Sequence, residues 1–340
     1  MSKAADLART ASASETALSN RNVFINGNFD VWQRSTSYTD VAGIWKYGFA
    51  DRWNAHNDGA DAGTFSRSTT VPDGGSTYSL LMTGASSVTN TNLNQKVESS
   101  GLQSIRQANS YTVSGWLMSE VAGKVINLSA NIPTNLDNHS GYNTVPLSTS
   151  ATITGNGVVN SVAQITLTSA STWYYFTATH SNPNGITNFA NGFALFLSFV
   201  GQTSTTHKVY LAQVQMESGP VATPFEHRSY GQELALCSRY YTDIVRADNK
   251  TAHLIGYVQT STVARFGFHI PMRTSPSITE TNFNILYGGG SEQAITSIDD
   301  ISQDNQFLSF RAIVAANLTS GQAVALHSDG AATLTFDAEL

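Results

Sequence analysis

Four oxygen-bearing side chains have the types and spacing of a cation site. Asn26, Asn28 and Asp30 alternate within "NVFINGNFDVW", and Glu217 ends the run "KVYLAQVQME". Oxygen-only ligands suit Ca²⁺, and β-sandwich domains often hold a structural Ca²⁺ where their first and last strands meet. The alternative interpretation is ordinary polar packing and turn capping. These four residues are therefore a candidate structural calcium site, with the alternative open.

Aromatic residues on loops form a second candidate site. Trp45 and Tyr47 lie in the glycine-bounded loop "GIWKYG", and Tyr142 lies in "HSGYNT". Aromatic rings on loops can stack on the faces of sugars, or they can close the lid of a hydrophobic core. We take Trp45, Tyr47 and Tyr142 as candidate carbohydrate-binding residues, with the lid as the alternative.

Signatures of catalysis are missing from the sequence. "YGGGS" at 287–291 is not followed by the Lys-Ser/Thr of a phosphate-binding loop, no GxSxG elbow occurs, and the histidines lack metal-ligand spacing. Cys237 lies on an apolar stripe, which indicates packing rather than a nucleophile. Asp51 and Arg52 beside Trp53 indicate a structural ion pair. We predict no catalytic residue and no enzymatic activity.

Composition narrows the classes of protein further. Charged residues make up 12% of the 340 residues, about half the roughly 25% of an average soluble protein. The net charge of −6 and the absence of a Lys/Arg cluster argue against nucleic-acid binding. One cysteine cannot form an intrachain disulfide, and no run has signal-peptide or membrane-spanning character. We expect a protein made in a reducing cytoplasm, without membrane insertion.

The elements that would position these candidate residues are mostly short β-strands. "NVFINGNFDVW", "YTVSGWLMS" (111–119), "KVINLSANI" (124–132), "QITLTSA" (164–170), "TWYYFTATH" (172–180), "GFALFLSFV" (192–200) and "KVYLAQVQME" (208–217) are bounded by turn residues. This pattern predicts an antiparallel jelly-roll-like sandwich over 21–228. Alternation in "STVARFGFHIPM", in "FLSFRAIV" and up to Glu339 predicts a second β-sandwich over 245–340. The fold class is therefore all-β.

Two other segments differ from this pattern. "SYGQELALCSRYY" predicts a helix linking the two sandwiches over 229–244, with Leu234, Cys237, Tyr240 and Tyr241 as packing or interface residues. Residues 1–20 carry Ala4, Leu7, Ala11, Ser14 and Leu18 at the spacing of a coiled-coil seam. They form an attachment or oligomerisation arm, or a frayed terminus.

Three motifs carry a resemblance to a known family. "RNVFINGNFDVWQR" followed by "FADRW" resembles the opening of a domain of bacteriophage tail fibres and related virion proteins. The matching positions are Asn22, Asn26, Gly27, Phe29, Trp32, Gln33, Arg34, Asp51, Arg52 and Trp53. A second match is Gly219, Ala222, Thr223, Pro224, Phe225, Glu226, Arg228, Glu233, Leu234, Cys237, Arg239, Tyr240 and Tyr241. A third is Met272, Arg273, Pro276 and Thr279.

The resemblance implies a virion structural protein, a tail fibre or fibre-like appendage assembled in the host cytoplasm. It implies a jelly roll similar to carbohydrate-binding modules, a homotrimer, adhesion to host-surface glycans, and contacts of the N-terminal arm with other virion proteins. The family pattern supplies no catalytic residue. Two alternatives stay open. One is a capsid decoration or head fibre without a receptor role, and the other is the carbohydrate-binding accessory module of a secreted enzyme.

Overall fold

A computed structural model describes residues 21–40, 43–59, 62–108, 110–145, 150–153, 158–161, 164–181, 187–246, 252–304 and 307–340. The chain divides into two compact units. We call Met1–Glu233 with Leu340 the N-terminal unit, and Leu234–Glu339 the C-terminal unit. The division falls inside the linking helix that the sequence predicts. The arm expected at 1–20 lies outside the described residues.

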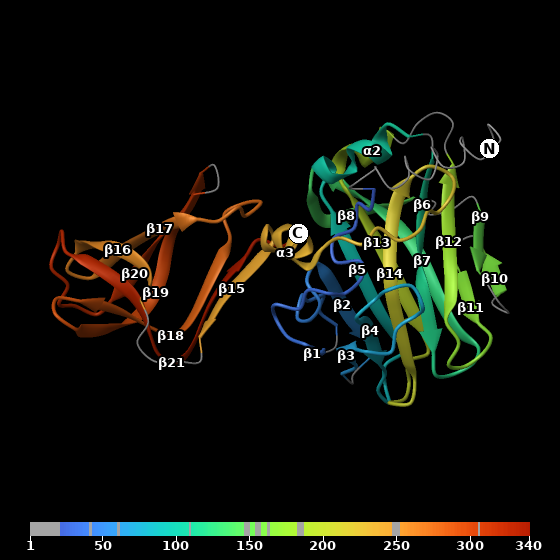
Figure 1. Cartoon of the computed structure of the whole chain (residues 1–340), viewed down its shortest axis with the longest axis horizontal. Helices are drawn as coiled ribbons and strands as arrows, with labels where there is room; N and C mark the ends of the chain where they lie inside the picture. The colour runs from blue at the N-terminus through green and yellow to red at the C-terminus, as the bar shows by residue number, and fades with distance from the viewer. Residues whose placement is uncertain are drawn as a thin grey trace, which may run out of the picture. The chain divides into compact units, whose positions relative to one another are not determined.

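Two antiparallel sheets of seven strands each form the described part of the N-terminal unit (Figure 1). The first sheet has the order β1 (Ser37–Thr39), β3 (Thr64–Ser68), β4 (Ser79–Thr83), β14 (Lys208–Ser218), β6 (Ser110–Ser119), β12 (Tyr174–Ser181), β9 (Ser150–Ile153). The second has the order β10 (Val158–Ser161), β11 (Gln164–Leu167), β7 (Lys124–Asn135), β13 (Phe193–Val200), β5 (Asn90–Val97), β2 (Trp53–Asp58). β8 (Asn138–Val145) pairs with β7. The short helices are η1 (Ser99–Leu102), α2 (Gln103–Arg106) and η2 (Thr187–Asn191).

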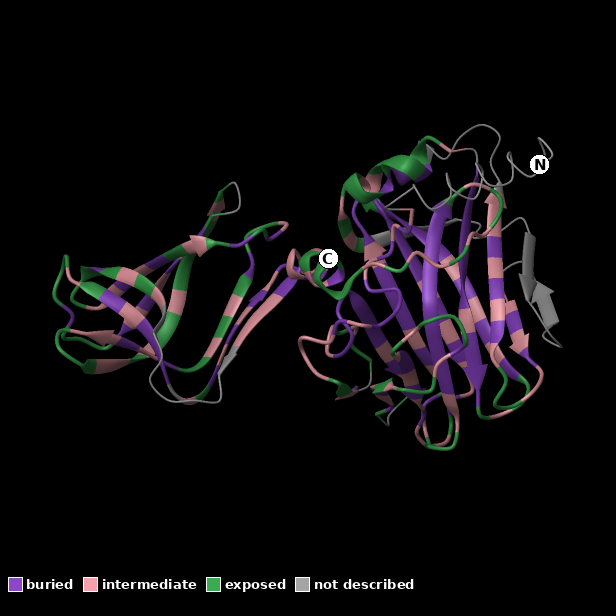
Figure 2. Cartoon of the chain, viewed as in Figure 1, coloured by how far each residue is buried: buried purple, intermediate pink, exposed green. Residues whose placement is uncertain are grey.

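The two sheets enclose one hydrophobic core. Alternate side chains of a strand point to opposite faces, and the inward set is fully buried, as in Leu211 of β14, Phe176 of β12, and Leu195 and Leu197 of β13. Figure 2 shows buried residues along these strands. Burying each such side chain is worth about 1.5–3 kcal/mol relative to exposing it. The N-terminal unit is therefore an antiparallel sandwich of jelly-roll type, as the alternation predicts.

Most expected strands are confirmed nearly to the residue. The prediction at 111–119 corresponds to β6, that at 124–132 to the first part of β7, and that at 208–217 to β14. The apolar run at 192–200 is β13, which lies between β5 and β7 inside its sheet. One face of β13 is fully buried in the core, and the other is partly covered, with Phe196 and Val200 half-buried, so apolar residues occur on both faces.

The first expected strand is wrong. Residues 22–32 form an irregular, largely buried loop. In this loop, side-chain amides form the hydrogen bonds to backbone groups that a neighbouring strand would otherwise form. Asn22 Oδ1 accepts from the backbone N–H of Phe24 and of Met216, both at 3.0 Å, and its Nδ2 donates to the carbonyl of Val214 at 3.1 Å. Asn and Asp side chains compete with regular structure in this way, so alternating residue types here do not produce a strand.

The linking helix is shorter than expected. α3 spans Tyr230–Ser238, whereas the sequence predicts 229–244. Ser229 Oγ accepts from the backbone N–H of Gln232 at 3.3 Å, and Gln232 Oε1 accepts from the backbone N–H of Ser229 at 3.0 Å. This reciprocal capping box fixes the start of the helix. From Tyr241 on, most residues are aromatic or β-branched (Tyr241, Thr242, Ile244 and Val245), and they pair with another strand instead of extending the helix. None of the described helices is long and apolar enough to span a membrane.

One antiparallel sheet makes up the described part of the C-terminal unit. Its order is β15 (Tyr241–Arg246), β21 (Ala323–Asp337), β16 (Ala252–Thr260), β17 (Val263–His269), β20 (Phe307–Val314), β19 (Ser291–Asp304), β18 (Ser277–Tyr287). β18 also pairs with β21, so the sheet closes on itself. The layers expected of a second sandwich are therefore opposite sides of one closed sheet.

The C-terminal unit has its own hydrophobic core. Phe266, Phe310, Leu326 and Phe336 are buried at its centre, and the rings of Phe266 and Phe310 stack at 5.6 Å. This cluster shares no residue with the core of the N-terminal unit. Each unit therefore has its own source of hydrophobic stabilisation.

Candidate functional site

A tight turn at Asn26 shapes the loop that leads to the candidate site. Asn26 has φ 57°, in the left-handed region that Asn tolerates better than most residues. Its Nδ2 donates to the carbonyls of Val31 at 2.8 Å and Asp51 at 3.0 Å, and its Oδ1 accepts from the N–H of Val31 at 3.0 Å. The side chain therefore ties the two ends of the turn together, and residues 27–30 form its tip.

Beside this turn lies a cleft of about 490 Å³. Three aromatic side chains line it, namely Trp32, Tyr78 and Tyr230. Its polar lining includes Asn28, Asp30, Arg67, Thr77, His227 and Arg228. Polar and charged residues thus outnumber the aromatic ones, and such a lining suits a polar small molecule better than an apolar one. All these residues belong to the N-terminal unit.

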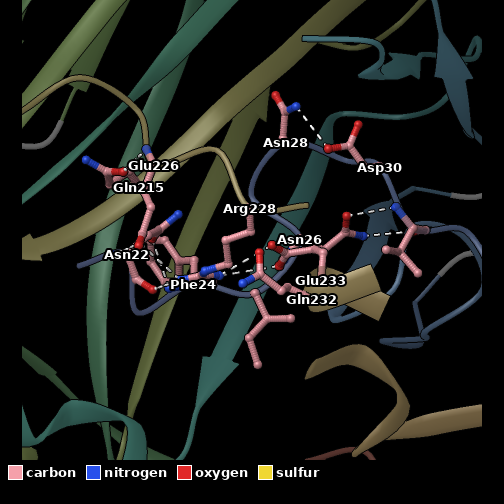
Figure 3. Close-up of polar contacts among 12 residues, drawn as sticks. Asn22, Phe24, Asn26, Asn28, Asp30, Gln215, Glu226, Arg228, Gln232 and Glu233 are labelled. Carbon is pink, nitrogen blue, oxygen red and sulfur yellow. Dashed lines mark hydrogen bonds and ion pairs between the residues drawn. The ribbon is translucent and has the colours of Figure 1, made fainter. Parts of the chain in front are cut away.

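A chain of hydrogen bonds orders the polar wall of the cleft. Gln213 Nε2 donates to Ser76 Oγ at 2.9 Å, Ser76 Oγ donates to Asn28 Oδ1 at 2.7 Å, and Asn28 Nδ2 donates to Asp30 Oδ2 at 3.0 Å. Figure 3 shows the last contact. Gln213 has φ 51° and sits where β14 slips in register against β6. Such a bulge redirects a side chain, and here it positions Gln213, the first donor of this series of hydrogen bonds.

Asp30 is the carboxylate of the cleft. Burial raises its pKa above the ordinary value, while the hydrogen bond from Asn28 and the charge of His227 act in the opposite direction. Within the described chain, Asn28 is its only hydrogen-bond partner. Asp30 therefore retains acceptor capacity for a bound group, because a carboxylate can accept about four hydrogen bonds.

The aromatic side chains differ in how much of each is available. Trp32 is half-buried, and its Nε1 donates to the carbonyl of Phe29 at 2.6 Å. The guanidinium of Arg67 lies over the ring of Tyr78, with its carbon 4.4 Å from the centroid. Tyr230, at the start of α3, is 60% exposed. An exposed Tyr at the rim of a cleft is suited to stacking on the apolar face of a sugar ring.

Arg228 holds the opposite wall in place. It donates to the backbone carbonyls of Phe24, at 3.1 Å, and of Asn22, and it lies 3.4 Å from both Glu226 and Glu233 (Figure 3). Glu233 also accepts from the backbone N–H of Asn26. Burial raises the pKa of Glu233, and the charge of Arg228 acts to lower it. This ion-pair network joins the segment before α3 to the loop 22–26.

The structure divides the predicted calcium ligands among three clusters. Asn28 and Asp30 meet in the cleft, whereas Asn26 uses its side chain to close the turn. Glu217 accepts from the hydroxyl of Thr223 at 2.6 Å and from the amide of Gln215 at 2.8 Å. Among the described residues, no three His, Cys, Asp or Glu side chains are grouped to hold a metal ion. The side chains thus take part in separate hydrogen-bond networks, as polar packing and turn capping would have them, and the shared Ca²⁺ site stays a prediction.

The aromatic residues predicted from loops lie outside the cleft lining. Trp45 is half-buried against His56 at 4.8 Å and Phe196 at 5.5 Å. Arg34 and Lys96 approach the ring of Tyr47 at 5.5 and 5.8 Å. These contacts suit the lid interpretation. Tyr142 pairs with Pro133 between β8 and β7, and its side chain lies outside the described part of the structure.

The predicted interface residues are mostly buried. Cys237 is fully buried, and Tyr240 and Tyr241 are 3% and 8% exposed. Leu234 is half-buried. Burial of Cys237 suits the packing role inferred from its apolar stripe. The role of these residues at a subunit interface stays a prediction.

Sequence reasoning missed Trp32, Arg67, Tyr78, His227 and Tyr230 as lining of one cleft. Trp32, Arg228 and the residues around them were singled out as motif positions, and Asn28 and Asp30 as metal ligands. The first motif, which contains Trp32, lies at the start of the jelly-roll sequence, and the second, which contains Arg228, lies at its end. The polar and aromatic residues of these two motifs were the available signal.

Comparison with protein-family models gives no match, and comparison with curated proteins gives none either. Among solved structures, the chain is similar to TmCBM61 in complex with β-1,4-galactotriose, at 13% identity and TM-score 0.32, over 58% of this chain and 99% of that one. It is also similar to the CBM22-1 xylan-binding domain from Paenibacillus barcinonensis Xyn10C, at 13% identity and TM-score 0.32, over 59% and 96%.

A third likeness is to the enzymatically active domain of bacteriophage CBA120 tailspike protein 4, at 11% identity and TM-score 0.36, over 58% of this chain and 22% of that one. The structural neighbours therefore include carbohydrate-binding modules and a phage tailspike. At such low TM-scores these likenesses carry no functional conclusion, and the site is interpreted from the chain's own residues.

Proposed function

We propose that this chain is a non-catalytic virion protein of a tailed phage, a tail fibre or fibre-like appendage that adheres to host-surface glycans. The observation that supports binding is the cleft, which three aromatic side chains line together with the hydrogen-bonded carboxylate of Asp30. Sugars present apolar ring faces and hydroxyl groups, which these two kinds of group recognise. The assignment to a virion rests on the sequence motifs shared with tail-fibre proteins.

Oligomerisation forms part of the proposal. One open cleft of this size binds a glycan weakly, and a homotrimer would present three copies to the same cell surface. Linked weak sites gain about 10²–10⁴ in avidity without any new contact. Light scattering on the full chain tests this step, and a monomeric mass would contradict the fibre form of the proposal.

The binding test uses the full chain on an array of bacterial surface glycans, with Trp32→Ala/Tyr230→Ala as the cleft variant. Truncating aromatic hot-spot residues costs about 2 kcal/mol or more, so we expect at least about a tenfold loss of affinity. Tyr257→Ala is the matched control, because Tyr257 is a 51% exposed aromatic in the C-terminal unit.

The outcomes separate the proposed function from its alternatives. Glycan binding that depends on the cleft but comes from a monomer favours an accessory carbohydrate-binding module. A trimer that binds no glycan favours a capsid decoration or head fibre. Equal losses in the cleft and control variants would place glycan binding outside the cleft.

A further inference from the structure

Arg67 brings an uncompensated positive charge to the cleft. It lies on β3 with its guanidinium over the ring of Tyr78, at 4.4 Å. In the described part of the chain, no carboxylate lies within ion-pair distance of Arg67. Contact with a ring face steadies the guanidinium but uses none of its five N–H donors. The donors of Arg67 are therefore available to an anion.

The second arginine of the cleft is in the opposite situation. Arg228 is neutralised by Glu226 and Glu233, both at 3.4 Å, and it also donates to two backbone carbonyls. Its charge and donors are used to hold the fold together. Recognition of an anionic ligand in the cleft therefore falls to Arg67.

Asp30 supplies the complementary group. It lines the same cleft as Arg67, yet the two form no ion pair in the described structure. Its Oδ2 accepts from Asn28, and the carboxylate has further acceptor capacity for hydroxyl groups. The cleft therefore presents the donors of Arg67 and the acceptor atoms of Asp30 at separate places. This arrangement suits a ligand that carries an anionic group and hydroxyl groups on one ring.

We propose that the cleft selects a carboxylate-bearing sugar, of the uronic or nonulosonic acid kind. The sugar carboxylate binds the guanidinium of Arg67, its hydroxyls donate to Asp30, and its ring stacks on Tyr230. Arginine–carboxylate pairs are often bidentate, and the two parallel hydrogen bonds between charged groups make them strong. This inference rests on the proposed function, because it names the class of glycan taken by the same cleft.

A neutral sugar fits the charges of the cleft less well. It would cover Arg67 and strip water from the guanidinium without supplying a counter-charge, which costs binding free energy. A cationic amino sugar would add a counter-charge beside Asp30, which already accepts from Asn28 and lies near the charge of His227, and it would leave Arg67 without one. The carboxylate of an acidic sugar supplies the counter-charge to Arg67, provided that it lies on the Arg67 side of the cleft and presents its hydroxyls to Asp30.

The test measures affinity by calorimetry for matched acidic and neutral probes on the full chain. The pairs are trigalacturonate with galactotriose, triglucuronate with glucotriose, and sialyllactose with lactose, at physiological salt. We expect the acidic member of at least one pair to bind about tenfold more tightly. Arg67→Ala should remove that preference and leave the neutral affinity nearly unchanged, and Arg67→Lys should keep part of it.

Arg106→Ala is the control, because Arg106 is an exposed arginine of α2 outside the cleft. Neutral and acidic probes that bind equally would overturn the preference for acidic sugars and leave the proposed glycan binding standing. An acidic preference reduced as much by Arg106→Ala as by Arg67→Ala would also overturn it, since diffuse charge would then explain binding. Failure of every probe, together with a silent glycan array, would overturn both proposals.

Discussion

The side-chain amide of Asn28 donates a 3.0 Å hydrogen bond to the carboxylate of Asp30, and this contact sets the orientation of the acidic group in the cleft. Asn28 is held in turn by the hydroxyl of Ser76, which accepts from Gln213 on the bulged strand β14. The carboxylate is therefore positioned by a strand far from it in sequence. Order of this kind reduces the entropy that binding would otherwise cost.

Removing the Ser76 hydroxyl, the middle group of this series of hydrogen bonds, should weaken glycan binding while the fold is kept. In Ser76→Ala, Asn28 and Gln213 each lose a partner, so Asp30 is less ordered. A hydrogen bond contributes about 0.5–1.5 kcal/mol, so affinity for the bound glycan should fall about two- to tenfold. Ser320→Ala is the control, because Ser320 is an exposed serine of the C-terminal unit whose hydroxyl also donates one hydrogen bond. Identical affinities for the two variants would show that the chain does not position Asp30.

Glycan binding should weaken on acidification because of Asp30. The ionised carboxylate is a stronger acceptor of sugar hydroxyls than the protonated acid, and burial raises the pKa of Asp30. A raised pKa means that protonation begins at a higher pH than for an ordinary Asp, so affinity falls as the pH decreases through that range. Calorimetry at a series of pH values measures this effect.

Variants assign the titration to one group. Asp30→Asn should bind more weakly at neutral pH, by about tenfold where a charged hydrogen bond is replaced by a neutral one, and its affinity should vary less with pH. The charge of His227 acts on Asp30, and the charge of Asp30 acts on Glu233. His227→Gln removes any contribution of the histidine to the pH dependence of binding. If Asp30→Asn leaves the pH profile unchanged, a residue other than Asp30 is the titrating group.

Alternation was a sound guide to strands but not to the loop that forms the site. β6, β13 and β14 follow from period-two patterns, since their inward residues must be buried. Residues 22–32 show a similar alternation without forming a strand. What decides there is the pairing of Asn22 with Val214 and of Asn26 with Asp51, contacts between distant residues that no local pattern reveals.

The cleft was beyond prediction for the same reason. Its residues come from three segments, at 28–32, 67–78 and 227–230, and side-chain contacts such as those of Ser76 with Asn28 and of His227 with Gly74 bring them together. Closure of the C-terminal sheet likewise depends on one long-range pairing, between β18 and β21. The choice of Trp45 and Tyr47 illustrates the limit, because an aromatic residue on a loop gives no sign of whether its ring packs inward.

Breaking the ion-pair network around Arg228 should strongly destabilise the N-terminal unit. The side chains of Arg228, Glu226 and Glu233 are 9%, 11% and 10% exposed. Arg228→Ala removes the cation that two nearly buried carboxylates share, and breaking a buried pair costs about 3–5 kcal/mol. For a unit of this size that corresponds to a fall in Tm of roughly 6–20 °C.

Calorimetric melting measures this change, with Arg228→Lys and Arg106→Ala as comparisons. Lysine keeps the charge but cannot reach two carbonyls and two carboxylates with one planar group, so its loss should be intermediate. Substitution of the exposed Arg106 should change stability by no more than about 0.5 kcal/mol. Equal Tm values for Arg228→Ala and Arg106→Ala would rule out a stabilising network.

Each unit should respond to substitutions in its own core. Phe310 is fully buried and packs on Phe266 at 5.6 Å, and Phe→Ala in a core costs about 3–5 kcal/mol. All five tryptophans lie between Trp32 and Trp173, in the N-terminal unit. Phe310→Ala should therefore lower a calorimetric transition while the tryptophan fluorescence melt stays in place. Phe65→Ala, in the other core, should shift the fluorescence melt, and a joint shift in both variants would reveal one cooperative unit.

Gly27 should be among the least replaceable residues of the chain. A Cβ at this position would lie 2.1 Å from the carbonyl oxygen of Val214, and the backbone N–H of Val214 donates to the carbonyl of Gly27 at 2.8 Å. Gly27→Ala therefore forces the loop away from β14. Overpacking typically costs about 1–3 kcal/mol, sometimes more, and the upper end is expected because a backbone oxygen cannot rotate away.

Gly231→Ala is the matched control for Gly27→Ala. Gly231 lies in α3, and a Cβ there would meet nothing within 4 Å. Alanine should stabilise the helix by about 0.5–1 kcal/mol, because glycine loses more backbone entropy on folding. The tryptophan fluorescence melt should therefore fall for Gly27→Ala and hold or rise for Gly231→Ala. Wild-type melting of Gly27→Ala would mean that the loop 22–32 does not pack against β14 as closely as the structure describes.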